Sequence, residues 1–251
     1  MLADSLYRIA ALARLNWTLR LRDPGQFLSY LLMPMILMLV FKPLYDRALV
    51  GGATQVATGM LVVFSTLALA IVGTATLTER TWHTWDRLRS TRVATAELLL
   101  GKALPIFLVL LAQQTILLVY AMVVIGVRPA GRPWLVVVAV VVWGSTLLAL
   151  GTAIAALVRS HGELSAICDI GALTLTTLGG AFVPVAMFPG WLQAVAPVSP
   201  GYWALSMLQA ALAGDVTGTL LPAAVLLTVG GVAGVFAAWR LGRGFGRATL
   251  L

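Results

Sequence analysis

Charged residues are scarce in this sequence. Of its 251 residues, 17 are Lys or Arg and 9 are Asp or Glu, so 10% are charged while 60% are hydrophobic. About a quarter of the residues in an ordinary soluble domain are charged, because its surface must be hydrated. The composition therefore excludes an ordinary soluble protein and predicts that lipid covers most of this chain.

Cysteine and histidine are also scarce. Cys168 is the single cysteine, which excludes a disulfide within the chain and a cysteine-rich metal site. His83 and His161 lie far apart and have no carboxylate or cysteine partner at ligand spacing. We therefore predict no metal site, and we expect Cys168 to be a small packing residue.

Several functional classes lack the residues that they require. Ser145 has no histidine partner inside the apolar runs and no paired aspartates occur there, so an intramembrane hydrolase is not predicted. An ion-coupled secondary transporter stays an alternative, although such a protein needs charged residues near the membrane midplane, where these runs have almost none. The basic and aromatic stripe of a nucleic-acid-binding module is absent.

What the chain does contain is six apolar runs of roughly 20 residues, the length at which an α-helix crosses a hydrocarbon core of ~30 Å. The predicted spans are 26–45, 55–78, 103–125, 134–158, 164–187 and 219–239. The alternating segments of a membrane β-barrel are absent. We therefore predict an all-α membrane protein with six transmembrane helices in one domain, residues 1–251.

The distribution of Lys and Arg predicts the orientation of these spans. One side carries 13 of the 17 basic residues: Arg8, Arg14, Arg20, Arg22, Arg80, Arg87, Arg89, Arg92, Lys102, Arg159, Arg240, Arg243 and Arg247. The other side carries Lys42, Arg47, Arg128 and Arg132. Because basic loops stay in the cytoplasm, both chain ends are predicted to be cytoplasmic, with membrane lipid rather than nucleic acid as the anionic partner.

The N-terminal segment is predicted to lead into the first span through a sharp elbow. Residues 3–22 are expected to form a helix along the cytoplasmic membrane interface, with a frayed basic tail as the alternative. Asp23 and Pro24 are a typical helix start, because Asp caps the helix and proline needs no hydrogen bond at its first position. Pro34 should kink the first span, for packing or for gating.

The loop at 79–92 between the second and third spans carries an apolar ridge. Trp82, Trp85 and Leu88 recur at three-residue spacing, which places them on one face of a helix. Charged residues flank the ridge: Glu79, Arg80, Arg87 and Arg89. The ridge either rests on the lipid interface, where Trp is enriched, or enters a groove on a cytoplasmic partner, and the pattern leaves both open.

Three sets of residues carry a family resemblance. They are Glu79 to Thr84 with Arg87 to Thr91 and Glu97 to Lys102; Arg22-Asp23-Pro24 with Pro34 and Phe41; and Gly179-Gly180, Pro184, Pro189, Trp191-Leu192, Pro197, Pro200, Tyr202 and Trp203. Together they resemble the type-2 ABC exporter permeases, which include the daunorubicin-resistance-type and polysaccharide-export permeases. The loop departs from the family pattern at Trp82, His83 and Arg92.

The resemblance implies a membrane subunit that pairs with a second permease, identical or homologous, and sits on two ABC ATPase subunits. It also implies that 79–92 is the segment coupled to the ATPase and that 188–213 forms two short helices re-entering the outer leaflet. No nucleotide loop is present, because Gly101-Lys102 is followed by Ala103. We therefore expect no enzyme activity in this chain, with ATP and Mg bound by the partner.

The expected function is export of a hydrophobic or amphiphilic substrate, such as a drug, lipid or glycolipid, from the cytoplasm or inner leaflet across a bacterial cell membrane. Drug efflux and antibiotic resistance are the corresponding roles, and polysaccharide export is the alternative. Candidate residues for gating or the substrate path are Pro34, Asp169, Phe182, Pro184, Phe188 and Trp191. For Asp169 we favour a structural role, within reach of Arg159 or the headgroups, over a functional one, and the aromatic residues equally suit an interfacial belt.

Overall fold

The computed structural model describes residues 25–81 and 95–242, and every regular element in these ranges is helical. The long helices are α2 (Gly25–Ala48), α3 (Gly52–Leu67), α4 (Leu69–Thr81), α6 (Thr95–Tyr120), α7 (Pro133–Leu157), α8 (His161–Leu178), α10 (Pro200–Ala213) and α11 (Val216–Gly242). The short ones are η1 (Ala121–Ile125), η2 (Val185–Met187), α9 (Gly190–Val195) and η3 (Ala196–Val198). The predicted all-α class is confirmed.

Five helical stretches in the described ranges are long and apolar enough to cross a membrane. They are Phe27–Ala48, Gly52–Thr78, Ala103–Ile125, Pro133–Leu157 and Val216–Arg240. These stretches overlap the first, second, third, fourth and sixth predicted spans. The fifth predicted span is not among them, so the total of six transmembrane helices stays a prediction.

The boundary predicted for the fifth span, 164–187, is wrong at its C-terminal end. The helix α8 ends at Leu178, and Gly180 follows with a φ of 91°. A residue with a side chain rarely adopts this left-handed conformation, so the chain turns here because glycine permits it. The remaining residues form a turn and the short helix η2, and α8 itself carries Glu163 and Asp169, which lower its apolar character.

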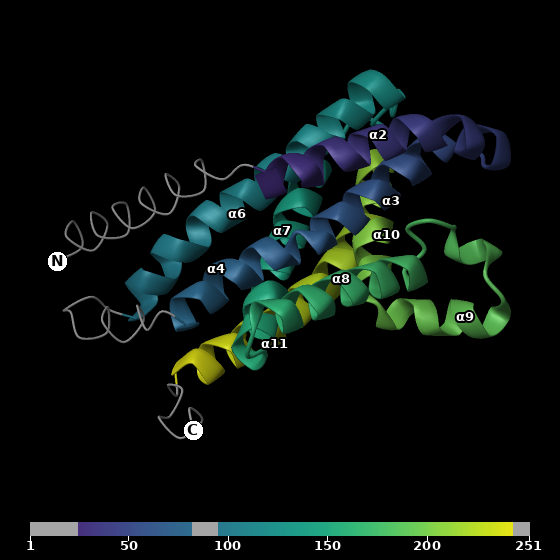
Figure 1. Cartoon of the computed structure of the whole chain (residues 1–251). Helices are drawn as coiled ribbons and strands as arrows, with labels where there is room; N and C mark the ends of the chain where they lie inside the picture. Colours follow the sequence, from purple (N-terminus) through teal and green to yellow (C-terminus); the bar gives the residue numbers. More distant parts are fainter. Residues whose placement is uncertain (1–24, 82–94, 243–251) are drawn as a thin grey trace.

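Although it is less apolar, α8 lies within the bundle. It packs against both α3 and α4, and Figure 1 shows it running beside them. Its buried residues recur at every fourth position: Leu164, Cys168, Ala172 and Thr176. This spacing gives one narrow buried stripe, and the expectation that Cys168 is a packing residue is confirmed by its exposed fraction of 1%.

The second span is the centre of the bundle, where 94% of its most apolar stretch is buried. It consists of α3 and α4, which Figure 1 shows in series between the helices on either side. Close helix contacts depend on glycine here. A Cβ at Gly59 would overlap the carbonyl of Ala181, and a Cβ at Gly73 would lie 2.6 Å from the Leu164 side chain.

The segment predicted as an outer hairpin, 188–213, contains two helices of unequal burial. The short helix α9 has no buried residue and Figure 1 shows it at one end of the bundle. In α10, Ser199 caps the first turn, Pro200 occupies it, and Gly214 ends the helix with a φ of 74°. The predicted short helix from Pro200 to near Gly214 is therefore confirmed, and it packs inward against α3, α7, α8 and α11.

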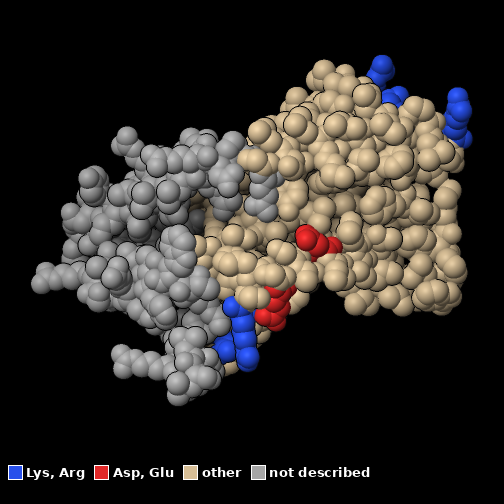
Figure 2. All heavy atoms as spheres, viewed as in Figure 1, with Lys and Arg blue, Asp and Glu red and all other residues tan. Residues whose placement is uncertain are grey.

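Charged side chains lie mainly at the ends of the described body. Figure 2 shows blue basic atoms at two opposite ends, with a broad tan surface between them that is interrupted by a few acidic atoms. Large exposed apolar side chains form much of that surface, for example Ile36 and Val40 on α2 and Val232 and Val235 on α11. A surface of this kind suits hydrocarbon rather than water.

We predict that Gly59→Ala destabilises the protein while Gly171→Ala does not. The added methyl at Gly59 overlaps the Ala181 carbonyl, and overpacking of this kind costs roughly 1–3 kcal/mol. A Cβ at Gly171 has no heavy atom within 4 Å, and alanine favours a helix over glycine. The melting temperatures of the two variants in detergent, followed by size-exclusion chromatography after heating, should separate them; equal melting would contradict the close α3 contact.

Candidate functional site

A cleft of about 470 Å³ opens between α3, the turn after α8, α10 and the start of α11. Its volume lies in the range of small-molecule sites. The lining combines apolar and polar side chains: Gln55, Pro184, Val185, Tyr202, Leu205, Ser206, Gln209, Ala210, Ala213 and Asp215, with Gly179. We refer to this surface as the hairpin cleft.

Two glutamines form the polar wall of the hairpin cleft. The Gln209 amide on α10 donates to the Gln55 side-chain oxygen on α3 at 2.7 Å, and it lies 3.3 Å from the Thr58 hydroxyl. The Gln55 amide in turn donates to the Gly180 carbonyl at 2.9 Å. Gln55 is only 8% exposed, so burial removes the water that would hydrate its amide, and these hydrogen bonds take the place of that water.

The local chain geometry brings these groups together. Gln55 lies in the first turns of α3, directly after the left-handed Gly51 that ends the α2–α3 connection. The left-handed turn at Gly180 places its carbonyl toward α3, and the Gly59 position lets the next carbonyl, that of Ala181, approach the same helix. The hairpin is therefore tied to the second span by backbone carbonyls and by Gln55.

The hairpin cleft has a mixed apolar and polar lining. Its apolar wall includes Pro184, Val185 and Leu205, while Asp215 contributes an exposed carboxylate at the start of α11. No group of three or more His, Cys, Asp or Glu side chains that could hold a metal is found in the described part of the chain. Small-molecule sites commonly combine apolar side chains with a few polar groups in this way.

The predicted gating and substrate-path residues do not come together in one place. Pro184 lines the hairpin cleft. Phe182 is half-buried, and its carbonyl accepts a hydrogen bond from the Tyr45 hydroxyl. The Phe188 carbonyl accepts from the Gln193 amide at 2.9 Å, whereas the Trp191 side chain is 70% exposed. Only Pro184 of this predicted set belongs to the cleft.

Pro34 and Asp169 lie elsewhere in the bundle. Pro34 is inside α2, which continues through it from Gly25 to Ala48. Asp169 is exposed on α8, and no ion pair joins it to Arg159 within the described ranges. The Arg159 backbone N–H donates to the Glu163 carboxylate at 2.8 Å. The predicted Asp169–Arg159 pair is not formed, and the alternative contact of Asp169 with the headgroups stays a prediction.

The predicted coupling residues lie mostly outside the described residues. Trp82, Trp85, Arg87, Leu88 and Arg89 fall in the range 82–94, and residues 3–24 are outside as well. The backbone at positions 79 and 80 belongs to the last turn of α4, which leads directly into the predicted coupling segment. The role of Glu79 and Arg80 and of the ridge stays a prediction.

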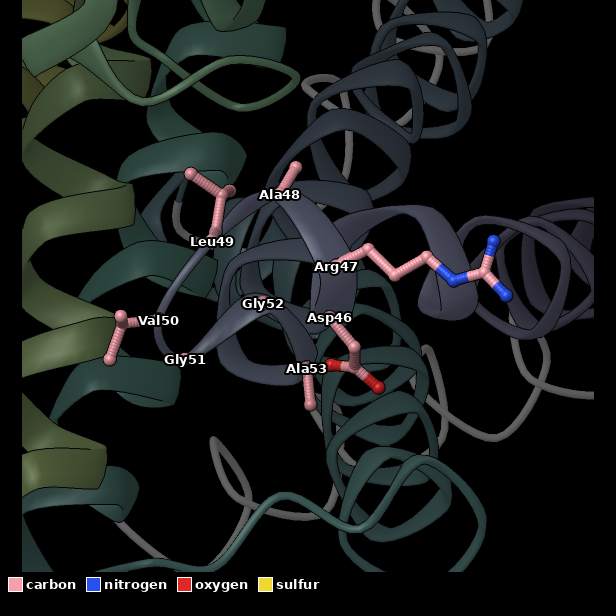
Figure 3. A pocket seen from close by; sticks show the side chains of 8 residues that line it. All are labelled: Asp46, Arg47, Ala48, Leu49, Val50, Gly51, Gly52 and Ala53. Carbon is pink, nitrogen blue, oxygen red and sulfur yellow. The ribbon is translucent and has the colours of Figure 1, made fainter.

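A second hollow, of about 540 Å³, lies at the α2–α3 connection and is larger than the hairpin cleft. All its lining residues belong to one consecutive stretch, 46–53, and Figure 3 shows the Arg47 side chain pointing away from the turn. Asp46 pairs with Lys42 at 2.9 Å within the same helix. This hollow is the inside of one turn, so we assign the candidate site to the hairpin cleft.

Sequence reasoning missed the glutamines. Gln55, Gln113, Gln114 and Gln209 all lie in helices, and the first three are buried. A search for charged residues at the midplane passes over them because amides are neutral. The available signal was an amide inside an apolar run, where each unpartnered polar group is costly.

Comparison with known proteins relates the chain to one transporter family. Residues 7–213 match the family described as ABC-2 type transporter. The chain belongs to this family. The resemblance to type-2 ABC permeases is thereby confirmed, and with its apolar helices the ABC-2 chain is a multi-pass membrane protein.

A curated relative is the linearmycin resistance permease protein LnrN of Bacillus subtilis (strain 168). The two sequences are 28% identical over 152 residues, which is 61% of this ABC-2 chain and 39% of LnrN. The chain thus matches less than two thirds of the relative's length.

We predict that Gln209→Leu destabilises this ABC-2 chain by roughly 1–3 kcal/mol, because the buried Gln55 side-chain oxygen then loses its donor. Gln193→Leu is the matched control, since its amide bonds only to exposed hairpin carbonyls. Thermal unfolding in detergent measures both. An equal, small change in the two variants would show that the Gln55–Gln209 bond does not hold α10 against α3.

Proposed function

We propose that this chain is the membrane subunit of an ATP-driven exporter that moves a hydrophobic or amphiphilic substrate out of the cytoplasm or the inner leaflet. The observation that carries the proposal is the family match over residues 7–213. The mixed apolar and amide lining of the hairpin cleft supports an amphiphile, and the resistance role in the relative's name supports a drug. The bacterial cell membrane, with both chain ends in the cytoplasm, is the proposed location.

The energy source is proposed to be a separate ABC ATPase. The chain has no phosphate-binding loop of its own, because Ala103 stands where that motif has Ser or Thr. ATP and Mg would therefore be bound by the partner, and two ATPase subunits would serve two permeases. The membrane subunit would contribute the coupling segment 79–92 and the substrate path.

The partner in the membrane is proposed to be a second permease, identical or homologous. The support comes from α8, whose buried stripe leaves most of its surface exposed. Asp169 lies on that exposed surface with Ser165, Thr174 and Thr177. A carboxylate facing hydrocarbon is unfavourable, by about 2.5–3.5 kcal/mol at a helix centre and by less near the headgroups, so this polar face suits another protein surface or the headgroup layer better than hydrocarbon.

Apolar residues on the same helix offer packing area for the pair. Ile167, Ile170 and Leu173 are 44%, 68% and 46% exposed. Two copies that meet through one patch form a closed two-fold pair, in which α8 of each copy faces the same region of the other. A pair of this kind would place both Asp169 side chains along the shared face.

The first functional prediction concerns coupling. Trp85→Ala should weaken association with the ATPase by roughly 2 kcal/mol, because aromatic anchors dominate such interfaces, and Trp82→Ala should act in the same direction. The rim variant Arg89→Ala should cost about 1 kcal/mol or less. Co-purification of the ATPase and its stimulated ATP hydrolysis, at matched membrane expression, measure both effects.

Trp134→Ala is the control for this experiment, because Trp134 is 49% exposed in the first turn of α7 and is predicted to lie at the opposite side of the membrane. It should leave ATPase association unchanged. Unchanged binding and transport in both Trp82→Ala and Trp85→Ala would assign the ridge to the lipid interface instead.

The second functional prediction concerns the pair. In a Cys168→Ala background, Ile170→Cys should form cross-linked dimers in nanodiscs at low protein-to-lipid ratio, because the α8 faces of two copies meet. Val232→Cys on α11 is the control, since Val232 is 73% exposed but lies on a helix assigned to lipid. A transport-competent Ile170→Cys protein that stays monomeric would contradict pairing through α8. Cross-linking only to a co-expressed homologue would indicate a pair of two different permeases.

A further inference from the structure

The second span is broken at Ala68, between α3 and α4. The Ala68 N–H donates to the carbonyl of Phe64 at 3.1 Å, and the Ala68 carbonyl accepts from the N–H of Ile71 at 3.0 Å, only three residues on. The chain from 60 to 72 contains neither proline nor glycine. The usual causes of a helix break are therefore absent, and side chains must account for it.

Two hydroxyl groups next to the break bond back to the helix. Ser65 and Thr66 both donate to the carbonyl of Val62, at 3.1 and 2.6 Å. Such bonds compete with the backbone ladder and bend helices. The Ser65 oxygen also accepts a bond of 2.7 Å from the indole N–H of Trp143 on α7, and neither side chain is exposed to solvent.

The side-chain amide of Gln113, on α6, bridges this break to the first span. Its nitrogen lies 3.2 Å from the carbonyl of Phe64 and 3.2 Å from that of Tyr30. Tyr30 stands four residues before Pro34, so its carbonyl is the one that the proline cannot bond. One amide, 1% exposed, therefore joins the proline site of α2 to the break of the second span.

The two sides of the break pack against different helices. The α3 side packs against α2, α6 and α10, while α4 packs against α7, and both contact α8. The α3 half also holds Gln55 of the hairpin cleft, and the α4 half leads into residues 79–92. Bending at Ala68 would therefore move the cleft side relative to the cytoplasmic side.

Gln113 and its neighbour Gln114 on α6 carry polar atoms without a partner, the first at the break and the second facing the Gly144 position of α7. In the described part of the chain the Gln113 side-chain oxygen and both amide atoms of Gln114 are buried without a hydrogen bond. Leaving such groups unpaired is unfavourable, so an arrangement that supplies partners competes with this one. A backbone N–H released at the break would be a donor for the unpaired Gln113 oxygen, because hydrocarbon offers none.

We propose that residues 65–68 are a flexure in the second span, and that Gln113 is the positioning residue that sets its angle. The bend itself needs only this chain. Its use in transport rests on the proposed function, because the ATPase would drive the α4 half through residues 79–92.

The first test uses the unaltered full chain alone in nanodiscs, by hydrogen exchange followed with mass spectrometry. Backbone amides of 64–71 should exchange faster than those of 56–62, because local opening starts at the break. Both stretches are buried except for the half-buried Leu67. Gln113→Met should increase exchange at 64–71 by about five-fold, the factor expected from one net hydrogen bond.

Thr76→Val is the matched control, since the Thr76 hydroxyl makes one local bond of 3.1 Å to Val72 in the same span. It should leave exchange at 64–71 unchanged. Equal exchange in 64–71 and 56–62 of the unaltered chain would overturn the flexure. Equal behaviour of Gln113→Met and Thr76→Val would overturn the role of Gln113. If Gln113→Met does not fold, the unaltered chain still decides the flexure. Thr66→Val, which removes one back-bond to Val62 and leaves the Ser65–Trp143 bond intact, should then slow exchange at 64–71.

The second test uses the complex with its ATPase. Trapping with ATP and vanadate should change exchange at 64–71 more than at 56–62, and Gln113→Met should lower transport per ATP hydrolysed while hydrolysis continues. Absence of any ATPase partner would contradict the proposed function but not the flexure, which the chain alone reports. Unchanged exchange on trapping, with normal transport, would overturn its part in transport.

Discussion

Every backbone N–H and C=O inside a membrane must find a partner within the protein, because hydrocarbon offers none. This constraint accounts for the positions of two buried amides, Gln55 and Gln113. Gln113 bonds the carbonyl that Pro34 leaves open, and Gln55 bonds the carbonyl that the left-handed Gly180 turns toward α3. At Pro34 and at Gly180, a neutral amide on another helix supplies a hydrogen bond that the local backbone does not make.

Neutral amides suit this purpose better than charges. A carboxylate or ammonium group in the apolar layer costs several kcal/mol to desolvate, whereas an amide can be satisfied by two or three hydrogen bonds. The contrast is visible in the chain, where Gln55 and Gln113 are buried while Asp169 is exposed on the outside of α8. The buried amides bond to groups on neighbouring helices, whereas both acidic residues of α8, Glu163 and Asp169, are exposed.

The hairpin cleft and the break in the second span lie on one continuous element. The α3 helix holds Gln55 near its start and the Phe64 carbonyl near its end, so one helix connects the cleft to the break. Packing of α10 against α3, α7, α8 and α11 makes the hairpin part of the bundle rather than a separate cap. A movement of the α3 half of the second span would therefore displace Gln55 and change the cleft directly.

Composition and run length by themselves determined the helical class, five of the spans, and the short helix from Pro200 to Gly214, because these depend on local hydrophobicity, proline and glycine. The family also followed from local motifs. The end of α8 at Leu178, the break at Ala68 and the pairing of Gln55 with Gln209 did not follow, and neither did the separation of Asp169 from Arg159. These features depend on which helices become neighbours, and only tertiary packing decides which carbonyl each buried amide reaches.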